Sequence, residues 1–336
     1  MSQFTQAAEE HPFAPYVRIL GKGKSGSRSL QRNEAAEAFS MILRGEVEAV
    51  QLGAFLMLLR VKEETGDELA GFVDACRQQM VQPPADLQAD LDWSSYAGKK
   101  HQHPWYLLSL LLISGAGYRV LVHGSDGHTA GRLYTEQAMR ELGLPVASDW
   151  QQAATQIEQQ QLSYLPLRAF CPALHELILL RPLLGLRSPV NTLTRLLNPL
   201  TAPASLQSVF HPAYSALHQR ADTLLGQANA GVFKGESGEI EVRPHADTQF
   251  YRLHDGHIDE HTLPRVLTGR AVPVEQPAVA PLLAMWRGSA ADAYGLNAVL
   301  ATTAAALMVL EPDWGMPACV AAAQDMWAAR DRERLD

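Results

Sequence analysis

"RVLVHGSDGHTAGRLYTEQAMRELG", residues 119–143, is the stretch that decides the fold class. An apolar run that is typical of a buried strand enters a glycine-rich polar turn and continues as a helical pattern. An apolar helical pattern precedes the stretch at 104–117, and a polar helix at 150–161 and a short strand at 162–167 follow it. Helices and strands that alternate in this way predict an α/β fold with a mainly parallel central sheet.

The turn in this stretch has the composition of a phosphate cradle. Gly124, Gly127 and Gly131 lie among short polar side chains, and backbone N–H groups beside a helix start can hold a phosphate. No lysine or arginine lies in the turn before Arg132, however, and Asp126 would repel an anion. A plain connection between a strand and a helix explains the turn at least as well.

The N-terminal part of the chain has a different pattern. Residues 33–80 carry apolar side chains at helical spacing, broken at Gly45 and Gly66, which predicts three amphipathic helices. The prolines and acids of residues 81–92 then mark a linker.

The C-terminal half returns to helices and then to strands. Residues 171–200 read as helical. The turn dipeptide Asp255-Gly256 predicts a hairpin between two of the later strands. The later strands are expected at 230–235, 248–254 and 257–264, and two apolar helices at 294–310 and 316–331.

The composition is that of an ordinary globular protein from a reducing compartment. The 336 residues are 47% hydrophobic and 19% charged, and the three cysteines are scattered, which argues against a disulfide framework or a cysteine zinc site. The N-terminus has no apolar core, and the longest apolar runs are too short to cross a bilayer. We expect a cytoplasmic protein with no secretion signal and no membrane span.

The charge is acidic overall but basic in places. A formal net charge of -8 argues against nonspecific attraction of nucleic acid to the whole surface. Residues 11–33, however, contain no acid and five bases, and residues 159–235 contain six bases against two acids. These segments allow a positive face on an acidic protein.

Two loops are candidates for such a face. "YAGKKHQHPWY", residues 96–106, interleaves cations with aromatic rings, a combination that suits an extended nucleic-acid strand because lysines meet phosphates while bases stack. A solvated basic loop whose aromatic rings turn into the core is an equal alternative. "LGKGKSGSRSLQR", residues 20–32, is a second flexible basic loop, and is a weak signal by itself.

A histidine-rich hairpin is the last candidate site. Strand alternation would send His257, Asp259 and His261 to one face, as a metal site requires. The polar outer face of an edge hairpin has the same composition, and we favour that interpretation.

Several of these segments together resemble a known family. Residues 45–72 resemble the N-terminal helices of anthranilate phosphoribosyltransferase (TrpD), and residues 181–200 resemble its helical crossover. The resemblance extends from about Leu20 to about Leu310. It implies a helical domain of residues 1–85, completed by the crossover helices at about 168–200, and an α/β domain of residues 90–165 and 201–336, assembled as a homodimer through the helical domains.

The substrate motifs of that family are altered in this chain. The family binds phosphoribosyl pyrophosphate at a G-T-G-G-D loop, an N-x-S-T helix start and a K-H-G-N-R turn. The first loop falls on residues 94–100, where Gly98 remains, and the helix start falls near Pro104 and Tyr106. At the turn, His123 and Gly124 remain, whereas Val122, Ser125 and Asp126 stand in place of the lysine, asparagine and arginine.

The magnesium pair is altered as well. The resemblance places the family's Asp-Glu pair at Ile240 and Glu241, so one carboxylate is lost and Glu241 is the remnant. Because the reaction needs metal and cations to stabilise the leaving pyrophosphate, these losses imply that the normal activity is gone and that no cofactor is bound. On the acceptor side, Arg181 and Asn191 match family residues, and Arg195 stands where the family has proline.

The pattern "VHG......R..TE", which includes Arg132, Thr135 and Glu136, resembles the divergent TrpD-like proteins of the YbiB group. That resemblance implies a homodimer that binds DNA or RNA in a basic groove. The alternative is a divergent glycosyl or phosphoribosyl transferase that uses His123 and Arg181 on an unidentified acceptor. No catalytic residue is assigned, and the residual cleft is expected at Gly98, His123, Gly124, Arg181 and Asn191. The nucleic-acid-binding candidates are Lys22, Lys24, Arg28, Lys99, Lys100, His101, Arg132, Arg181, Arg187 and Arg195.

Overall fold

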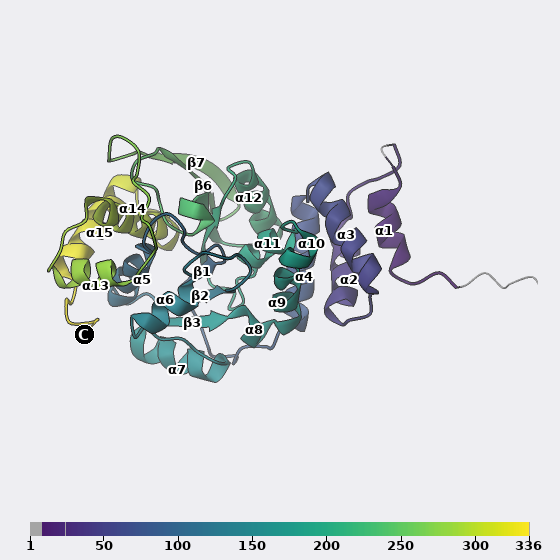
Figure 1. Ribbon diagram of the computed structural model, residues 1–336, viewed down its shortest axis with the longest axis horizontal. Coiled ribbons are helices and arrows are strands. Elements are labelled where there is room, and N and C mark those ends of the chain that lie inside the picture. The colour runs from purple at the N-terminus through teal and green to yellow at the C-terminus, as the bar shows by residue number, and fades with distance from the viewer. Residues whose placement is uncertain (1–8, 24, 336) are drawn as a thin grey trace, which may run out of the picture.

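The computed structural model describes residues 9–23 and 25–335. Figure 1 shows an elongated molecule with a bundle of helices at one end and an α/β domain at the other. The helical end contains the three helices predicted from residues 33–80, preceded by one short helix. These are α1 (Ala14–Gly21), α2 (Arg32–Leu43), α3 (Ala49–Lys62) and α4 (Gly66–Gln79).

The crossover helices lie against this bundle, beside α4 (Figure 1). One apolar core joins the two groups, because the buried side chains of the bundle and those of the crossover belong to the same cluster. The crossover comprises α8 (Leu167–Phe170), α9 (Pro172–Leu179), α10 (Arg181–Leu184), α11 (Val190–Leu193) and η1 (Thr194–Leu196).

A seven-stranded sheet forms the centre of the α/β domain, with the strand order β3-β2-β1-β4-β5-β6-β7. The first five strands in this order are parallel, and the last two are antiparallel. The α/β fold and the mainly parallel sheet are therefore confirmed. The strands are β1 (Leu91–Ser95), β2 (Val120–Gly124), β3 (Leu162–Pro166), β4 (Ala204–Val209), β5 (Asn229–Lys234), β6 (Thr248–His254) and β7 (His257–Leu263).

Helices cover both faces of this sheet. α14 and α5 pack together in one core cluster with the sheet, while α12 packs on β5 and β6 and also against α4. The helices of the domain are α5 (Tyr106–Gly115), α6 (Thr135–Glu141), α7 (Trp150–Gln160), α12 (Tyr214–Leu224), α13 (Ala280–Arg287), α14 (Ala293–Leu310) and α15 (Met316–Ala329), with the short η2 (Glu236–Gly238).

α14 is the one helix of the described residues that is long and apolar enough to cross a membrane, so the expectation that every apolar run is too short is wrong. Of its 18 residues, 61% are buried in the molecule, and the helix packs against α5, α15 and the sheet. That packing is typical of the core helix of a soluble α/β domain.

The hairpin at the sheet edge forms as predicted. Asp255 and Gly256 both have positive φ angles, as a two-residue hairpin turn requires. Asp259 on the exposed face of β7 pairs with Arg252 at 2.7 Å and lies 3.3 Å from His261 Nε2. The polar side chains here form the outer surface of an edge strand, and no group of three potential ligands that suits a metal is found among the residues the structure describes.

Candidate functional site

The strand order reverses between β1 and β4, and this point locates the candidate site. From β1 the chain proceeds to β2 and β3 on one side of the sheet, and then returns to β4 and β5 on the other. In open α/β sheets, ligand clefts form at the carboxyl ends of the strands at such a point. The loop after β1, the turn after β2 and the segment that contains η2 meet there.

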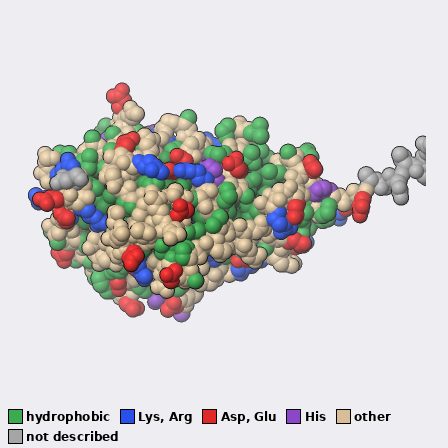
Figure 2. Space-filling view, turned by 90° about the horizontal axis from the view of Figure 1, so that it is seen from below, with side chains coloured by type: hydrophobic (Ala, Val, Ile, Leu, Met, Phe, Trp, Pro, Cys, Tyr) green, Lys and Arg blue, Asp and Glu red, His purple; other side chains and the backbone are tan. Residues whose placement is uncertain are grey.

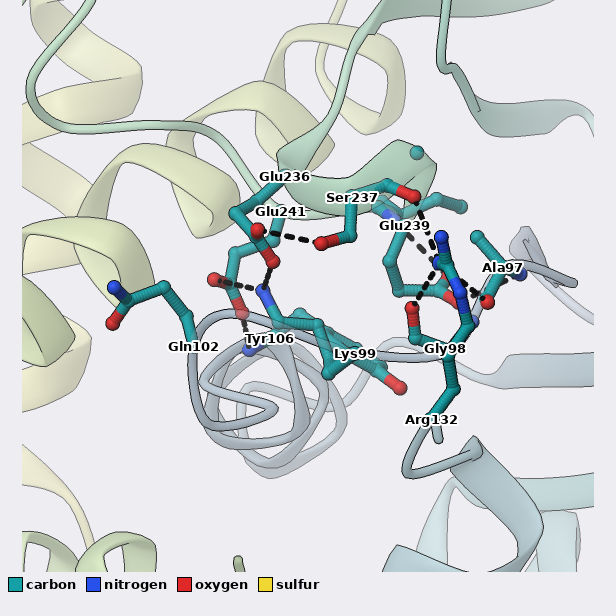
Figure 3. Close-up of polar contacts among 12 residues, drawn as sticks. Ala97, Gly98, Lys99, Gln102, Tyr106, Arg132, Glu236, Ser237, Glu239 and Glu241 are labelled. Carbon is teal, nitrogen blue, oxygen red and sulfur yellow. Dashed lines mark hydrogen bonds and ion pairs between the residues drawn. The ribbon is translucent and has the colours of Figure 1, made fainter. Parts of the chain in front are cut away.

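Lys99, in the loop after β1, lies at the centre of this region and is completely buried. Its Nζ is 2.5 Å from Glu236 Oε2 and 2.5 Å from Glu241 Oε1. Figure 3 shows the ammonium pointing between the two carboxylates, and Glu241 also accepts the backbone N–H of Tyr106 at 3.0 Å. The prediction that Lys99 is exposed on a loop is therefore wrong, because two buried carboxylates hold its side chain inside.

The protonation of this cluster follows from burial and charge together. Burial alone would lower the pKa of Lys99, but the adjacent carboxylates of Glu241 and Glu236 outweigh it, so its pKa is raised. Burial raises the pKa of Glu241 to about 7, although Lys99 opposes the shift. Lys99 is therefore a fixed internal cation, and it neutralises the carboxylates beside it.

A second set of contacts fixes the loop backbone beside Lys99 (Figure 3). Glu239 accepts the N–H groups of Ala97 and Gly98 at 3.1 and 2.9 Å. Arg132 donates to the carbonyls of Ala97, Gly98 and Ser237. Gly98 has a φ of 66°, and a Cβ there would lie 3.0 Å from the Tyr134 ring, so glycine suits this position. The loop after β1 is held from both sides.

Tyrosines fill the space between this loop and the turn after β2. The Tyr96 hydroxyl lies 2.7 Å from His123 Nδ1, and His123 Nε2 lies 3.1 Å from Asp92 Oδ1. The Tyr106 hydroxyl lies 2.6 Å from Thr135 Oγ1. All of these side chains are buried, so they form packed polar contacts rather than an open cradle.

The turn after β2 is tied to its neighbours by its own side chains. Gly124 allows a close approach of two strands, because a Cβ there would lie 2.1 Å from the carbonyl oxygen of Ser95. His128 Nε2 lies 2.8 Å from the Tyr96 carbonyl oxygen, and burial lowers the His128 pKa to about 4, so this imidazole is neutral and donates. Arg181 donates to the His128 carbonyl oxygen and to Thr129 Oγ1. Asp126 lies 3.8 Å from Arg168.

Next to this packed region is an open hollow, called here the first hollow, between the crossover and the end of β4. It encloses about 100 Å³, and no carboxylate lines it. Its lining residues are Arg60, Arg187, Ser188, Asn191, Thr192, Arg195, Ser208, Val209, Phe210, His211, Tyr214 and His218.

The arginines of the first hollow lack acidic partners. Arg187 has no hydrogen bond and no ion pair among the residues that the structure describes. Burial, reinforced by Arg195, Arg132 and Arg181, lowers its pKa to about 10, so it remains protonated at neutral pH. Arg195 is 8% exposed, and its Nε is buried without a hydrogen-bond partner. A half-buried charge without a partner is costly, so an anion in the first hollow would offset part of that cost.

A second hollow of about 460 Å³ shares Phe210 with the first. Two lysines and two arginines line it, and its one carboxylate, Glu236, is paired with Lys99. Phe210 itself is 45% exposed. The two hollows together are called here the basic groove. The second hollow is lined by Lys100, His101, Gln102, Arg132, Phe210, Lys234, Gly235, Glu236, Ser237, Arg243, His245, Ala271, Pro273 and Tyr294.

The outer surface is less one-sided than this groove. On the face in Figure 2, lysine and arginine side chains lie among aspartate and glutamate side chains and do not gather into a broad basic surface. With a net charge of -8, the protein combines an acidic exterior with a recessed line of cations.

Comparison with known proteins identifies the family to which this architecture belongs. A family model described as "Glycosyl transferase family, helical bundle domain" matches residues 15–80, and one described as "Glycosyl transferase family, a/b domain" matches residues 107–323. The chain belongs to this glycosyl transferase family. It is a divergent, TrpD-like member.

Relatives of this glycosyl transferase family include both enzymes and proteins without a stated activity. The uncharacterised protein YbiB of Escherichia coli is 30% identical over 233 residues, which cover 68% of this chain and 72% of YbiB. Anthranilate phosphoribosyltransferase of Methylocella silvestris is 29% identical over 71% of this chain and 68% of that enzyme.

Solved structures show the same fold. TrpD of Thermus thermophilus superposes with a TM-score of 0.80 at 22% identity and covers 94% of each chain. The Saccharomyces cerevisiae enzyme, described in complex with PRPP and Mg, superposes with a TM-score of 0.78 at 15% identity, and covers 96% of this chain and 94% of that one.

The residues expected in the cleft of this glycosyl transferase family member do not all share one space. Asn191 lines the first hollow, whereas Arg181 of α10 donates to the His128 carbonyl oxygen in the turn after β2. Gly98 is packed against Tyr134, whereas His123 and Gly124 are buried under Tyr96 and Ser95. A reaction that uses His123 and Arg181 together in an open cleft does not fit this arrangement, because His123 has no exposed surface.

The expected nucleic-acid-binding residues also separate into groups. Arg187 and Arg195 line the first hollow, with Arg195 mostly buried, and Lys100, His101 and Arg132 line the second. At the helical end, Lys22 is exposed, Arg28 is paired with Glu34 at 2.7 Å, and Lys24 lies outside the described residues.

Three other groove cations were not among the expected nucleic-acid-binding residues. Lys234 and Arg243 flank residues 235–242, which contain three glutamates. Two cations beside such an acidic stretch could have been recognised in the sequence as candidate site residues. Arg60 comes from α3, far away in sequence, and only the folded chain brings it to the first hollow, where it donates to the Tyr214 hydroxyl at 2.8 Å.

Proposed function

We propose that this member of the glycosyl transferase family binds single-stranded nucleic acid in the basic groove and no longer transfers a phosphoribosyl group. The observation that carries the proposal is the groove itself, in which seven lysine and arginine side chains face one carboxylate that is already paired. Cations recessed in this way suit a flexible strand, whose phosphates can enter a groove, better than a rigid duplex.

An aromatic ring supports a strand over a simple anion. Phe210 is exposed at the junction of the two hollows, and cations lie on both sides of it. A nucleobase stacked on such a ring is worth about 1–3 kcal/mol, in addition to the phosphate contacts. The second hollow, at about 460 Å³, has room for a nucleoside beside its cations.

The carboxylates of the site do not suit the magnesium ion that is named with the yeast enzyme. The donor set here is Glu236 and Glu241, and the Lys99 ammonium lies 2.5 Å from each. A divalent ion would have to displace a buried cation from both carboxylates. Magnesium-dependent release of pyrophosphate from phosphoribosyl pyrophosphate by the purified protein would contradict the proposed loss of transfer.

We further propose that the protein is a cytoplasmic homodimer that forms through its helical end. Val50, Ala54, Met57 and Val61 follow one another at helical spacing along α3. Val50 and Val61 are 79% and 84% exposed, so an apolar stripe remains uncovered in the single chain. A second copy of the chain would bury this stripe, as the resemblance to TrpD implies.

Fluorescence polarisation with a labelled single-stranded oligonucleotide tests the binding proposal. We expect binding at low salt. The logarithm of the association constant should fall linearly with the logarithm of the salt concentration, with a slope of about 0.7 per phosphate contact. Arg187→Gln and, separately, Arg243→Gln should each lower the affinity and reduce the slope by about 0.7 for the phosphate contact that is lost.

Arg44→Gln is the matched control, because Arg44 lies on the surface of the helical end in a pair with Glu46 and its loss changes the net charge equally. The proposal fails if the unmodified protein binds no oligonucleotide at low salt, or if the groove variants and the control bind alike.

A further inference from the structure

The first hollow is much smaller than the second hollow of the basic groove. It encloses about 100 Å³, whereas the second hollow encloses about 460 Å³. A cavity measured in the same way needs about 10–15 Å³ to hold one water molecule. The first hollow therefore has room for a group the size of a phosphate, while the second has room for a nucleoside.

The donors of the first hollow are unusually free. Arg195 uses its Nη atoms on the carbonyl oxygens of Asn191 and Gly238, and its buried Nε has no partner. Arg187 has neither a hydrogen bond nor an ion pair within the described part of the chain. Arg60 is bonded only to the neutral Tyr214 hydroxyl. Three guanidinium groups thus converge on one small space without a carboxylate.

Glu64 and Glu239 lie near Arg60 and Arg195 but form no ion pair with them in the described residues. Glu64, behind the wall of the hollow, accepts from Thr192 Oγ1 at 2.7 Å, and Glu239 is occupied by the N–H groups of Ala97 and Gly98. His218 also lines the hollow, but burial and Arg195 lower its pKa to about 3, so it is neutral. The three arginines supply the permanent positive charge of the hollow, and His211 also lines it.

A phosphodiester inside a strand matches this space poorly. It carries one negative charge and two free oxygens, and a strand must both enter and leave the place where it binds. A terminal phosphate monoester carries a charge of about −1.5 to −2 at pH 7 and three acceptor oxygens, and it ends the chain. Its charge and its number of acceptors correspond to three converging guanidinium groups.

We propose that the first hollow binds the terminal phosphate monoester of a nucleic-acid strand, so that the protein recognises phosphorylated strand ends. The terminal base then stacks on Phe210 at the mouth of the hollow, and the following nucleotides lie along Lys100, Arg132 and Arg243 in the second hollow. This inference rests on the proposed binding of nucleic acid in the groove and specifies which part of the strand enters first.

Competition binding with one short oligonucleotide in three forms tests the inference. The forms carry a 5′-phosphate, a 3′-phosphate or hydroxyls at both ends. We expect one of the phosphorylated forms to bind about tenfold more tightly or better, since charge-assisted bonds to a buried phosphate are strong. The advantage should grow between pH 5 and pH 7, as the monoester takes up its second charge.

Variants separate this site from the rest of the groove. Arg187→Gln and, separately, Arg60→Gln should abolish the preference, so that each variant binds the phosphorylated forms and the hydroxyl form alike. Arg243→Gln, in the second hollow, should weaken all three forms alike and keep the preference.

Two negative results have different meanings. Equal affinity for the three forms overturns the inference and leaves the proposed function standing. Binding of none of the forms overturns both. A preference that persists in Arg187→Gln and in Arg60→Gln overturns the assignment of the phosphate to the first hollow.

Discussion

At the scale of single residues, Lys99 determines what the centre of the molecule can hold. Its ammonium neutralises two carboxylates that have no other buried cation beside them in the described residues. In a buried ion cluster of this kind, removing the charges from water costs a large free energy. The cluster is therefore stable only while every member is present. The residue that looked like a surface contact for phosphate is instead a structural part of the core.

Replacement of Lys99 by Met therefore predicts a large loss of stability. Glu236 and Glu241 would remain buried without a cation, and removal of one partner from a buried ion pair costs about 3–5 kcal/mol. Urea denaturation followed by circular dichroism measures this loss. Lys100→Met is the matched control, because Lys100 is the exposed neighbour and should change the free energy of unfolding by less than about 0.5 kcal/mol. Equal stability of the two variants would contradict the structural role of Lys99.

A second prediction concerns Asp222 on α12, whose buried carboxylate accepts from Gln207 Nε2 at 2.9 Å. Burial raises the pKa of Asp222 from 3.8 to about 7. The folded protein thus retains a proton that the unfolded chain loses between these values. The contribution of the Asp222 proton to the free energy of unfolding is complete below about pH 4, and it is lost as the pH rises through 7.

Asp222→Asn should remove this pH dependence. Relative to the variant, the unmodified protein should lose up to about 4 kcal/mol of unfolding free energy between pH 4 and pH 8. Urea titrations at several pH values provide the measurement, with Asp313→Asn at an exposed position as the control. A difference between the two proteins that stays constant over this pH range would rule out the raised pKa.

At the scale of elements, the sequence predicted those helices and strands whose apolar residues have a clear period. The helices of residues 33–80, the strand at 119–124 and the hairpin around Asp255 were all predicted correctly. β1 and β4 were missed, because "LDWSS" and "ASLQSV" bury polar side chains on both faces and lack an apolar pattern. Ser205 bonds Asp92 at 3.2 Å, and Gln207 bonds Asp222 at 2.9 Å, so these polar side chains are accommodated in the central strands.

The apolar stripe on α3 gives a prediction at the same scale. Val61→Glu places a charge on an exposed residue of the stripe, so it should convert the proposed homodimer into a monomer of unchanged fold. Light scattering coupled to size-exclusion chromatography measures the mass, and circular dichroism checks the fold. Gln78→Glu introduces the same charge on the exposed face of α4 and should leave the dimer intact. An interface at this stripe would be refuted if the unmodified protein is a monomer, or if the dimer survives Val61→Glu.

At the scale of the whole molecule, the site was predictable only in part. The resemblance to TrpD located the region, and the segments that carry Arg187, Arg195 and Lys100 do contribute to the basic groove. Sequence could not show that Lys99 turns inward, because its partners Glu236 and Glu241 are more than a hundred residues away. It could not show that Arg60 of the helical end reaches the end of β4 for the same reason.

The recessed position of the cations also has a consequence for rates. Outside the groove a strand meets a molecule of net charge -8, which repels it over a Debye length of about 10 Å at 0.1 M salt. Salt screens this long-range repulsion, so added salt should raise the association rate constant, the reverse of the steering seen in proteins with a basic exterior. The dissociation rate constant should rise more steeply, since salt also competes with the contacts inside. At low salt, a strand should therefore associate slowly and dissociate slowly. Such kinetics favour strands that stay single-stranded long enough for an end to enter the groove.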